Sequence, residues 1–350
     1  MPAPECLATV ELADCARAVL ERDGATALNY GPVGGYDPLR EWLAERHGVG
    51  PAEILLTNGS LQGLDLLVGR YAPERRVLVE APTYDRALAI ATRRGAEIRA
   101  VPHDDEGLDP DGLERELRED PGPALLYVLP TFQNPTGRTL SIDRRRRLLE
   151  LAAEHDLLIL EDDPYRLVRF EGDDLPSLHE LAGGTGVLYS SSFSKIVAPG
   201  LRVGYLVLPA SLGVELERTA LSTYLAPTFP TQAIVFEFLR RGLLEPNIER
   251  ISGLLRARRD ALVTALAREL PDASFTQPDG GYFLWLELPS GTDANELLVA
   301  AEAAGVRFVP GGEFFLDANR GETAARLAFS FPSPDEIDEA VRRLAAVVAG

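Results

Sequence analysis

Apolar residues follow two alternating spacings through most of the chain. Short runs of consecutive apolar residues, at 54–56, 77–79, 124–129 and 157–160, are typical of strands that are buried on both faces. Between these runs, apolar residues recur every three or four positions, for example in the segment that begins at Ser60, and this spacing indicates amphipathic helices. The alternation predicts an α/β fold with a largely parallel sheet.

Residues that favour helix ends mark some of the expected boundaries. Asp37 and Pro38 are expected to begin a helix, as an N-cap residue and a first-turn proline. The helix should end at His47, because Gly48 follows it. Ser141 is expected to cap another helix in the same way.

The pattern changes after residue 230, where longer helices and shorter strands are expected. These helices and strands lie at about 230–240, 248–270, 282–288, 306–309 and 327–330, with a closing helix from residue 335. We therefore expect three parts. Residues 1–49 form an N-terminal segment that packs on the small domain, 50–230 form a large domain, and 231–350 form a small C-terminal domain.

Composition and charge exclude several classes of protein. The 350 residues include 54 acidic and 35 basic side chains, and the net charge of −19 repels nucleic-acid phosphates and anionic lipids. With 45% hydrophobic and 25% charged residues, the composition is typical of a soluble globular protein. No apolar run approaches the roughly 20 residues that span a bilayer, and the start does not resemble a signal peptide. We expect a cytoplasmic protein that binds no nucleic acid, membrane or metal.

Two local patterns have ordinary structural interpretations. Cys6 and Cys15 are expected to lie in one amphipathic first helix as reduced thiols, since two cysteines make no disulfide framework. The basic run Arg144–Arg147 could suggest nucleic-acid binding. The other positions of its helix are largely leucine and alanine, which favours a solvated helix face instead.

The chain contains a single lysine, Lys195, among its 35 basic residues. Arginine replaces lysine well as a surface cation, but it does not release its proton in a protein. Lysine can become a neutral amine and attack a carbonyl group. This difference makes Lys195 a candidate nucleophile, with a remaining surface lysine as the alternative.

Groups that bind anions flank Lys195. Ser192 and Ser194 precede it and Arg202 follows seven residues later, so hydroxyl and guanidinium groups are available for a phosphate. The segment 59–62 begins a predicted helix, whose free N–H groups would provide a second anion site. Together these features predict a site for a phosphorylated aldehyde.

Acidic residues follow the predicted strand at 157–160. In open α/β sheets, ligands bind where the carboxyl ends of the strands emerge. A carboxylate there, such as that of Asp162, could hold a proton on a ring nitrogen. Solvation in a loop is the alternative for each acid, and for Glu161 and Asp163 it is the favoured interpretation.

Three further residues are candidates with simpler alternatives. Asn134 begins an Asn-Pro-Thr-Gly segment that also suits a turn. Tyr84 could stack on a ligand or pack in the core. Arg326 precedes an apolar strand and needs an anionic partner there, which a substrate carboxylate would supply.

Several short segments together resemble those of one enzyme family. They are Tyr30–Arg40, Thr57–Ser60, Pro82–Tyr84, Asn134–Gly137, Asp162 with Tyr165, Ser192–Lys195, Leu201–Gly204 and Arg326–Leu327. Their order is that of the class I and II aminotransferases, and the resemblance covers almost the whole chain. It is strongest to the branch with 2-aminoadipate and kynurenine aminotransferases and the aminotransferase domains fused to winged-helix regulators.

This resemblance implies the architecture of fold-type I pyridoxal-phosphate transferases, in which a large domain with a mainly parallel sheet adjoins a smaller α+β domain. It also implies pyridoxal 5'-phosphate as the cofactor. Lys195, Asp162 and Tyr84 take the catalytic positions. Lys195 would form the Schiff base and move the proton at the substrate α-carbon, Asp162 would keep the ring nitrogen protonated, and Tyr84 would stack on the ring.

The resemblance further implies which residues bind the cofactor and the substrate. The cofactor-binding positions are Tyr30, Ser60, Leu61, Tyr84, Asn134, Asp162, Tyr165, Ser192, Ser194, Lys195 and Arg202. Asn134 and Tyr165 would bind the phenolic oxygen of the cofactor, while Arg326 and Asn134 would bind the substrate α-carboxylate. Tyr30 would reach the phosphate of a neighbouring subunit, which implies a homodimer.

Two positions depart from the family pattern. Leu61 stands where relatives often have glutamine, so one side-chain donor near the phosphate is absent. The segment 1–5 resembles the middle of the family's N-terminal arm, so either the start codon is misassigned or the substrate pocket is built differently, without the upstream part of that arm. The winged-helix regulator form is not expected here.

The expected function is an aminotransferase that exchanges an amino group between an α-amino acid and a 2-oxo acid. One alternative is another carbanion reaction on the same fold, namely elimination, replacement, racemisation, decarboxylation or oxidation of an amino acid. A second alternative is a non-catalytic sensor of the cofactor or an amino acid. The motifs do not separate these reactions well, because the cofactor supplies the common chemistry and the pocket decides its outcome.

Overall fold

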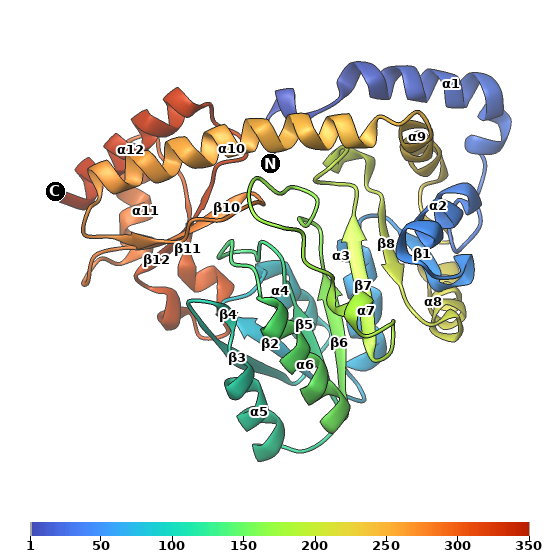
Figure 1. Cartoon of the computed structure of the whole chain (residues 1–350), viewed down its shortest axis with the longest axis horizontal. Coiled ribbons are helices and arrows are strands. Elements are labelled where there is room, and N and C mark those ends of the chain that lie inside the picture. Colours follow the sequence, from blue (N-terminus) through green and yellow to red (C-terminus); the bar gives the residue numbers. More distant parts are fainter. Residues whose placement is uncertain (1, 350) are drawn as a thin grey trace.

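The structure, a computed structural model, describes residues 2–349, which contain two β-sheets with helices packed around them (Figure 1). The larger sheet has eight strands in the order β1–β8–β7–β6–β5–β2–β3–β4. Its strands are β1 (Ile54–Thr57), β2 (Arg76–Ala81), β3 (Ile98–Asp104), β4 (Gly107–Leu108), β5 (Ala124–Val128), β6 (Leu157–Asp162), β7 (Val187–Ser192) and β8 (Gly204–Val207). The five strands from β7 to β3 in this order run parallel to one another.

Helices cover both faces of this sheet, as the runs of consecutive apolar residues predict. In β5, Leu125 and Tyr127 face one apolar cluster, which includes residues of α3 (Ser60–Tyr71) and α4 (Asp85–Arg93). The alternate residue Leu126 faces a second cluster, with α5 (Pro110–Glu119) and α6 (Ile142–Glu154). Side chains alternate between the faces of a strand, so a strand covered on both faces must be apolar at every position. The expected α/β class is confirmed.

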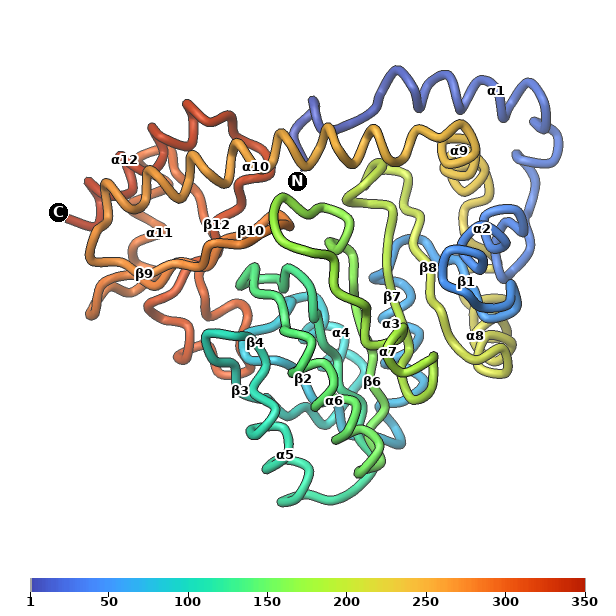
Figure 2. Tube along the Cα trace, viewed as in Figure 1, coloured from blue at the N-terminus to red at the C-terminus, as the bar shows by residue number. Residues whose placement is uncertain are grey.

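The smaller sheet is antiparallel and has four strands in the order β11–β12–β10–β9. These strands are β9 (Ser274–Phe275), β10 (Phe283–Glu287), β11 (Val309–Pro310) and β12 (Ala324–Ala328). The remaining helices are α1 (Thr9–Ala27), α2 (Asp37–His47), α7 (Leu178–Leu181), α8 (Ala210–Thr223), α9 (Phe229–Arg240), α10 (Leu244–Glu269), α11 (Ala294–Ala303) and α12 (Pro334–Ala349). Figure 2 shows α10 running from α9 to the smaller sheet, while α1 packs against α9.

Several expected helix boundaries agree with the structure. Helix α2 begins at Asp37 and ends at His47, and Gly48 after it has the left-handed backbone conformation. Asp37 is nevertheless the first helical residue and not the cap, because Tyr36 occupies the cap position and the Asp37 carboxylate pairs with Arg40.

None of the helices described between residues 2 and 349 is long and apolar enough to cross a membrane.

Two expectations about local structure are wrong. Cys6 and Cys15 do not share a helix, since Cys6 ends a separate 3-10 turn and Leu7 after it is extended before α1 begins. Both thiols are nevertheless buried and free. Arg326 does not precede its strand but lies within β12, at the residue paired with Trp285 of β10. Its backbone therefore lies between two paired strands, β10 and β11, and not at a strand end.

Candidate active site

A cavity of about 150 Å³ lies at the carboxyl ends of the parallel strands β5, β6 and β7. Ten of the twelve residues expected at the site line it. These are Ser60, Leu61, Tyr84, Asn134, Asp162, Tyr165, Ser192, Ser194, Lys195 and Arg202. Open α/β sheets bind ligands at this edge, because the loops that follow the strands converge there.

Lys195 follows β7 and presents its amine to two aromatic rings. Its Nζ lies 5.6 Å from the ring centre of Tyr165 and 5.2 Å from that of Tyr282. Burial lowers the pKa of Lys195 to about 8, and the nearby guanidinium groups of Arg326 and Arg202 act in the same direction. A substantial fraction of the amine is therefore neutral near pH 8, as a nucleophile or a proton acceptor requires.

Asp162 ends β6 and is 5% exposed. One of its carboxylate oxygens, Oδ2, accepts a 2.7 Å hydrogen bond from the Tyr127 hydroxyl. The other, Oδ1, is buried and accepts no hydrogen bond from the described residues. Burial raises the pKa of Asp162 to about 6, while Tyr127 and Ser190 act to lower it. Buried polar atoms normally have partners, so Oδ1 fits a ligand that brings an N–H donor, such as a protonated ring nitrogen.

The other side of the cavity provides donors for an anion. Ser194 donates its backbone N–H to Ser192 Oγ at 3.0 Å, and Arg202 Nη1 lies 3.5 Å from Ser194 Oγ. Helix α3 begins at Ser60, where free N–H groups and the helix dipole favour negative charge. A Cβ atom at Gly59 would lie only 2.1 Å from Arg202 Nη2, so glycine lets the guanidinium approach the helix start. These groups fit a phosphate.

Arg326 is a half-buried cation that forms no ion pair with the residues described. Its Nη1 donates to Asn134 Oδ1 at 2.9 Å, and its Nε is buried without a partner. The guanidinium carbon lies 4.2 Å from the ring centre of Phe283 and 4.8 Å from that of Phe314. Two aromatic faces hold the group flat but do not neutralise its charge. A ligand carboxylate would supply the missing counter-charge.

Tyr84 and Tyr165 are both present as neutral phenols at ordinary pH. Burial raises the pKa of Tyr84 to about 12, and the pKa of Tyr165 is also raised by burial. Tyr84 stands immediately before α4, so the helix start fixes the position of its backbone. Both hydroxyls can therefore donate hydrogen bonds to a ligand.

Tyr30 is the one predicted residue that the structure does not bring near the others. Its side chain is 83% exposed and does not line the cavity. Its expected role toward a neighbouring subunit stays a prediction.

Glu161 and Asp163 are buried, so the expectation that they are solvated is wrong. They flank Asp162 at the end of β6, and their side chains take the face opposite to the cavity because directions alternate along a strand. Glu161 accepts the backbone N–H groups of Leu178 and His179, each at 2.9 Å, at the start of α7. Burial raises the pKa of Glu161 to about 8 and that of Asp163 to about 6.

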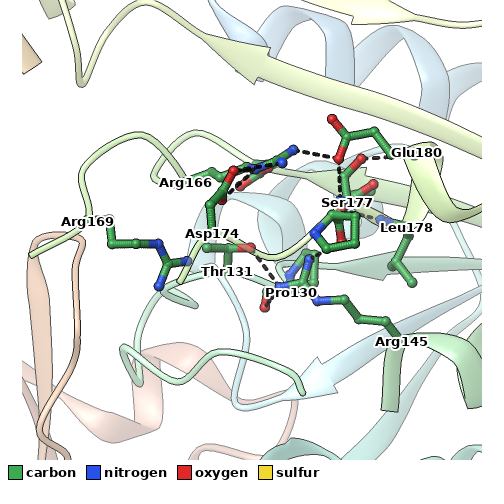
Figure 3. Close-up of polar contacts among 12 residues, drawn as sticks. Pro130, Thr131, Arg145, Arg166, Arg169, Asp174, Ser177, Leu178 and Glu180 are labelled. Atoms are coloured by element: carbon green, nitrogen blue, oxygen red, sulfur yellow. Dashed lines mark hydrogen bonds and ion pairs between the residues drawn. The ribbon is translucent and has the colours of Figure 1, made fainter. Parts of the chain in front are cut away.

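The basic run on α6 is only partly a solvated face. Arg145 is 0% exposed and donates to the carbonyl oxygens of Leu140, Pro176 and Pro130, at 3.0, 3.0 and 2.9 Å. Figure 3 shows its guanidinium beside Pro130 and Thr131, at the start of the loop that leads to Asn134. The sequence suggested neither this burial nor the contact of Asp162 with Tyr127, since both depend on elements far apart in the chain.

Figure 3 also shows the charged groups above this buried arginine. Arg166 forms ion pairs of 2.9 Å with both Asp174 and Glu180. Glu180 in turn accepts the backbone N–H of Ser177 in a capping box at the start of α7. These contacts fix the segment that follows Tyr165 against the larger sheet.

A single lysine, a buried carboxylate with a free acceptor and an anion site at the edge of a mainly parallel sheet define a pyridoxal-phosphate enzyme of fold type I. The family model described as "Aminotransferase class I and II" matches residues 7–344. The chain belongs to the class I and II aminotransferases.

Individual relatives agree with this assignment. The chain is 40% identical over 355 residues to a 2-aminoadipate transaminase of Thermus thermophilus, covering 100% of this chain and 89% of that protein. A solved structure of an alpha-aminoadipate aminotransferase from Thermus thermophilus, complexed with N-(5'-phosphopyridoxyl)-L-leucine, has a TM-score of 0.94 at 39% identity and covers 100% of this chain and 90% of its own. A Pyrococcus horikoshii kynurenine aminotransferase with PMP, also a solved structure, has a TM-score of 0.94 at 36% identity, with 100% and 89% coverage.

These comparisons confirm the expected family, fold and transaminase activity. They also support pyridoxal 5'-phosphate as the cofactor, in agreement with the donors and acceptors around the cavity.

Proposed function

We propose that this cavity transfers an amino group between an α-amino acid and a 2-oxo acid, with Lys195 as the residue that acts covalently and moves the proton. The observation that carries the proposal is the position of the only lysine in the sequence. Lys195 lines a cavity that is also lined by Asp162 with its free acceptor and by Asn134. Asn134 accepts a hydrogen bond from Arg326, a cation without an ion pair among the described residues.

Lys195 has two tasks in this proposal. Pyridoxal 5'-phosphate, when bound, supplies an aldehyde for covalent capture of an amine and a ring that withdraws electrons from the substrate α-carbon. Lys195 would hold that aldehyde covalently in the absence of substrate. With its amine free, Lys195 would accept the proton of the substrate α-carbon and deliver it to the cofactor, and its lowered pKa of about 8 suits both roles.

Asp162 would keep the cofactor ring electron-withdrawing. Its Oδ1 would accept a hydrogen bond from a protonated ring nitrogen, while Tyr127 donates to Oδ2 and so fixes the orientation of the carboxylate. A protonated ring nitrogen would be favoured there, because each carboxylate oxygen would then have a partner. Ser60, Ser192 and Arg202 bind the phosphate, together with Ser194 and the N–H groups at the start of α3.

Arg326 binds the α-carboxylate of the substrate with two parallel hydrogen bonds. Asn134 Oδ1 accepts from Arg326, so the Nδ2 of the same amide remains as a donor toward the cofactor and substrate. Tyr165 would donate its hydroxyl to the phenolic oxygen of the cofactor, and Tyr84 would stack on the cofactor ring.

The assembly and the division of the chain are further parts of this proposal. A homodimer would let the exposed Tyr30 of one subunit complete the phosphate site of the other. The division at residues 230/231 is supported by the separation of the two sheets, at 54–207 and 274–328, while the division at 49/50 stays a prediction from the sequence. A cytoplasmic location and a role in amino-acid biosynthesis fit the two buried free thiols and the relatives' names.

The direct test is a half-reaction followed by absorption. The purified protein with cofactor is mixed with single amino acids in the absence of any oxo acid, and the panel includes 2-aminoadipate, kynurenine, leucine and the aromatic amino acids. We expect the near-visible absorption band to disappear with release of one equivalent of oxo acid. Product beyond one equivalent, or no change with any amino acid, would contradict transamination.

A further inference from the structure

The structure assigns a positioning role to Gln133, a buried residue beside the active-site cavity. We infer that its side chain holds Asn134 and Tyr84 in the places from which they contact cofactor and substrate. This inference rests on the proposed function, which gives those two residues their roles. Gln133 is 1% exposed and does not line the cavity, so any effect on the reaction must pass through its neighbours.

The amide of Gln133 uses all of its hydrogen-bonding capacity. Its Oε1 accepts from the backbone N–H and the hydroxyl of Thr136, at 2.9 and 2.7 Å. Its Nε2 donates to the carbonyl oxygen of Pro82 at 2.8 Å and to Glu80 Oε2 at 3.3 Å. A primary amide has two N–H donors and two acceptor lone pairs, so no capacity is left over. If the amide were turned over, its oxygen would face the oxygens of Pro82 and Glu80, and its NH2 group would face the Thr136 N–H. The turned orientation is therefore excluded.

The Thr136 contacts close the loop that contains Asn134. This residue lies between Gln133 and Thr136, and the loop is closed again by a 2.6 Å bond from the Gly137 N–H to the Gln133 carbonyl. The Asn134 side chain then lies 2.9 Å from Arg326 Nη1. A change in the loop would move this acceptor away from the guanidinium that binds the substrate carboxylate.

The Pro82 contact fixes a second loop, the one that contains Tyr84. Pro82 lies two residues before Tyr84, and between them Thr83 donates its N–H to the Phe314 carbonyl at 2.9 Å. The ring of Phe314 lies 4.8 Å from the Arg326 guanidinium. Gln133 therefore joins the loop of Asn134 to a segment that is hydrogen-bonded to Phe314, whose ring packs against the substrate-binding arginine.

Glu80 fixes the orientation of Gln133 from the interior of the sheet. It lies on β2, is 1% exposed, accepts the Leu129 N–H at 3.0 Å and pairs with His103 Nε2 at 3.1 Å. A second observation shows that the loop is constrained. Phe132, directly before Gln133, has a φ of 48°, which bulky residues rarely adopt unless the surrounding structure imposes it.

The test compares two ligands on the protein freed of cofactor. Calorimetric titration gives the dissociation constants of pyridoxamine 5'-phosphate and of N-(5'-phosphopyridoxyl)-L-leucine, which adds an amino-acid part with a carboxylate. In Gln133→Leu, unsatisfied groups let the loop shift, and we expect the leucine adduct to bind roughly tenfold more weakly. Pyridoxamine 5'-phosphate should weaken by about threefold or less, because its phosphate donors are untouched.

Gln232→Leu is the matched control. Gln232 is equally buried at 1% exposed, and its amide bonds Tyr36 N–H and the Thr228 carbonyl, neither of which lines the cavity. We expect its two dissociation constants to change by the same factor or not at all. The same selective loss in both variants would overturn the positioning role, as would an unchanged adduct affinity in Gln133→Leu.

Exchanging the partners tests the contact itself. In Gln133→Glu a second carboxylate faces Glu80, so adduct binding should weaken. Adding Glu80→Gln restores a donor between the two positions, so the double variant should bind the adduct at least about threefold more tightly than Gln133→Glu alone. If the adduct affinity does not recover, the contact between residues 80 and 133 is not the cause of the weaker binding. If the unmodified protein binds neither ligand, the proposed function itself fails, and that outcome is distinct from all of these.

Steady-state kinetics give a second measurement. Gln133→Leu should raise KM for the amino donor by more than it lowers kcat, because Lys195 and Asp162 keep their own contacts. A fall in kcat with an unchanged KM would instead indicate a direct catalytic effect and overturn the positioning role.

Discussion

Replacing Arg145 by methionine should destabilise the protein far more than the same change at its neighbour. Arg145 donates four hydrogen bonds to Leu140, Pro176, Pro130 and Thr131 and is 0% exposed. Bonds from a charged donor contribute about 1.5–3 kcal/mol each, or about 6–12 kcal/mol for the set. Removing the charge also relieves a desolvation penalty of several kcal/mol, so we expect a net loss of about 3–5 kcal/mol.

The assay is urea unfolding of the cofactor-free protein, followed by far-ultraviolet circular dichroism. Without cofactor, ligand binding does not add to the measured stability. Arg146→Met is the control, because the Arg146 side chain is 62% exposed and its one ion pair within residues 2–349 is with Asp143, at 3.4 Å. We expect its effect to stay below about 0.5 kcal/mol. Equal losses for the two variants would refute the reasoning from burial, and Arg145→Lys, which keeps the charge but reaches fewer acceptors, should fall between them.

Three further outcomes are expected. Lys195→Arg keeps the charge but loses the nucleophile, so turnover should fall by roughly four orders of magnitude or more, and borohydride reduction should attach no cofactor; retained turnover would exclude the covalent role. Arg326→Lys should raise KM for the amino donor roughly 10- to 100-fold, since a lysine cannot form two parallel bonds; steady-state kinetics would show an unchanged KM if another residue binds the carboxylate. Burial raises the pKa of Glu161 to about 8, so this carboxyl lowers stability progressively as the pH rises from its ordinary pKa toward 8. In Glu161→Gln, the free energy of unfolding measured by urea titration, minus that of the parent protein, should therefore increase from about pH 5 to about pH 8. A difference that stays constant or falls over this range would contradict the reasoning.

Most elements of the larger sheet could be predicted because their apolar pattern is strong. The runs that became β5 and β6 are apolar at nearly every position, as two covered faces require. The strand β3 was not predicted. Only Val101 in it is buried, since β3 lies near the edge of the sheet and pairs beyond β2 with just the two-residue strand β4. An edge strand has little apolar pattern to reveal it.

The candidate site was predictable where short motifs contain the functional groups. Lys195 and Ser194 lie side by side in the sequence, and the lack of any other lysine drew attention to them. Tyr127, Tyr282 and Gln133 were not predicted. Each contacts the site through its fold position alone, and an isolated tyrosine or glutamine in a sequence carries no signal of such a contact.

By itself, the sequence determined the fold class, the enzyme family and the segments from which the site is built, because periodicity and motifs are local properties. Tertiary structure decided which charged groups are buried. Arg145, Glu161 and Asp163 lie in stretches that look solvated, yet the fold removes them from water and supplies partners from distant segments. The free energy of a buried charge depends on those partners, and they meet only when the chain has folded.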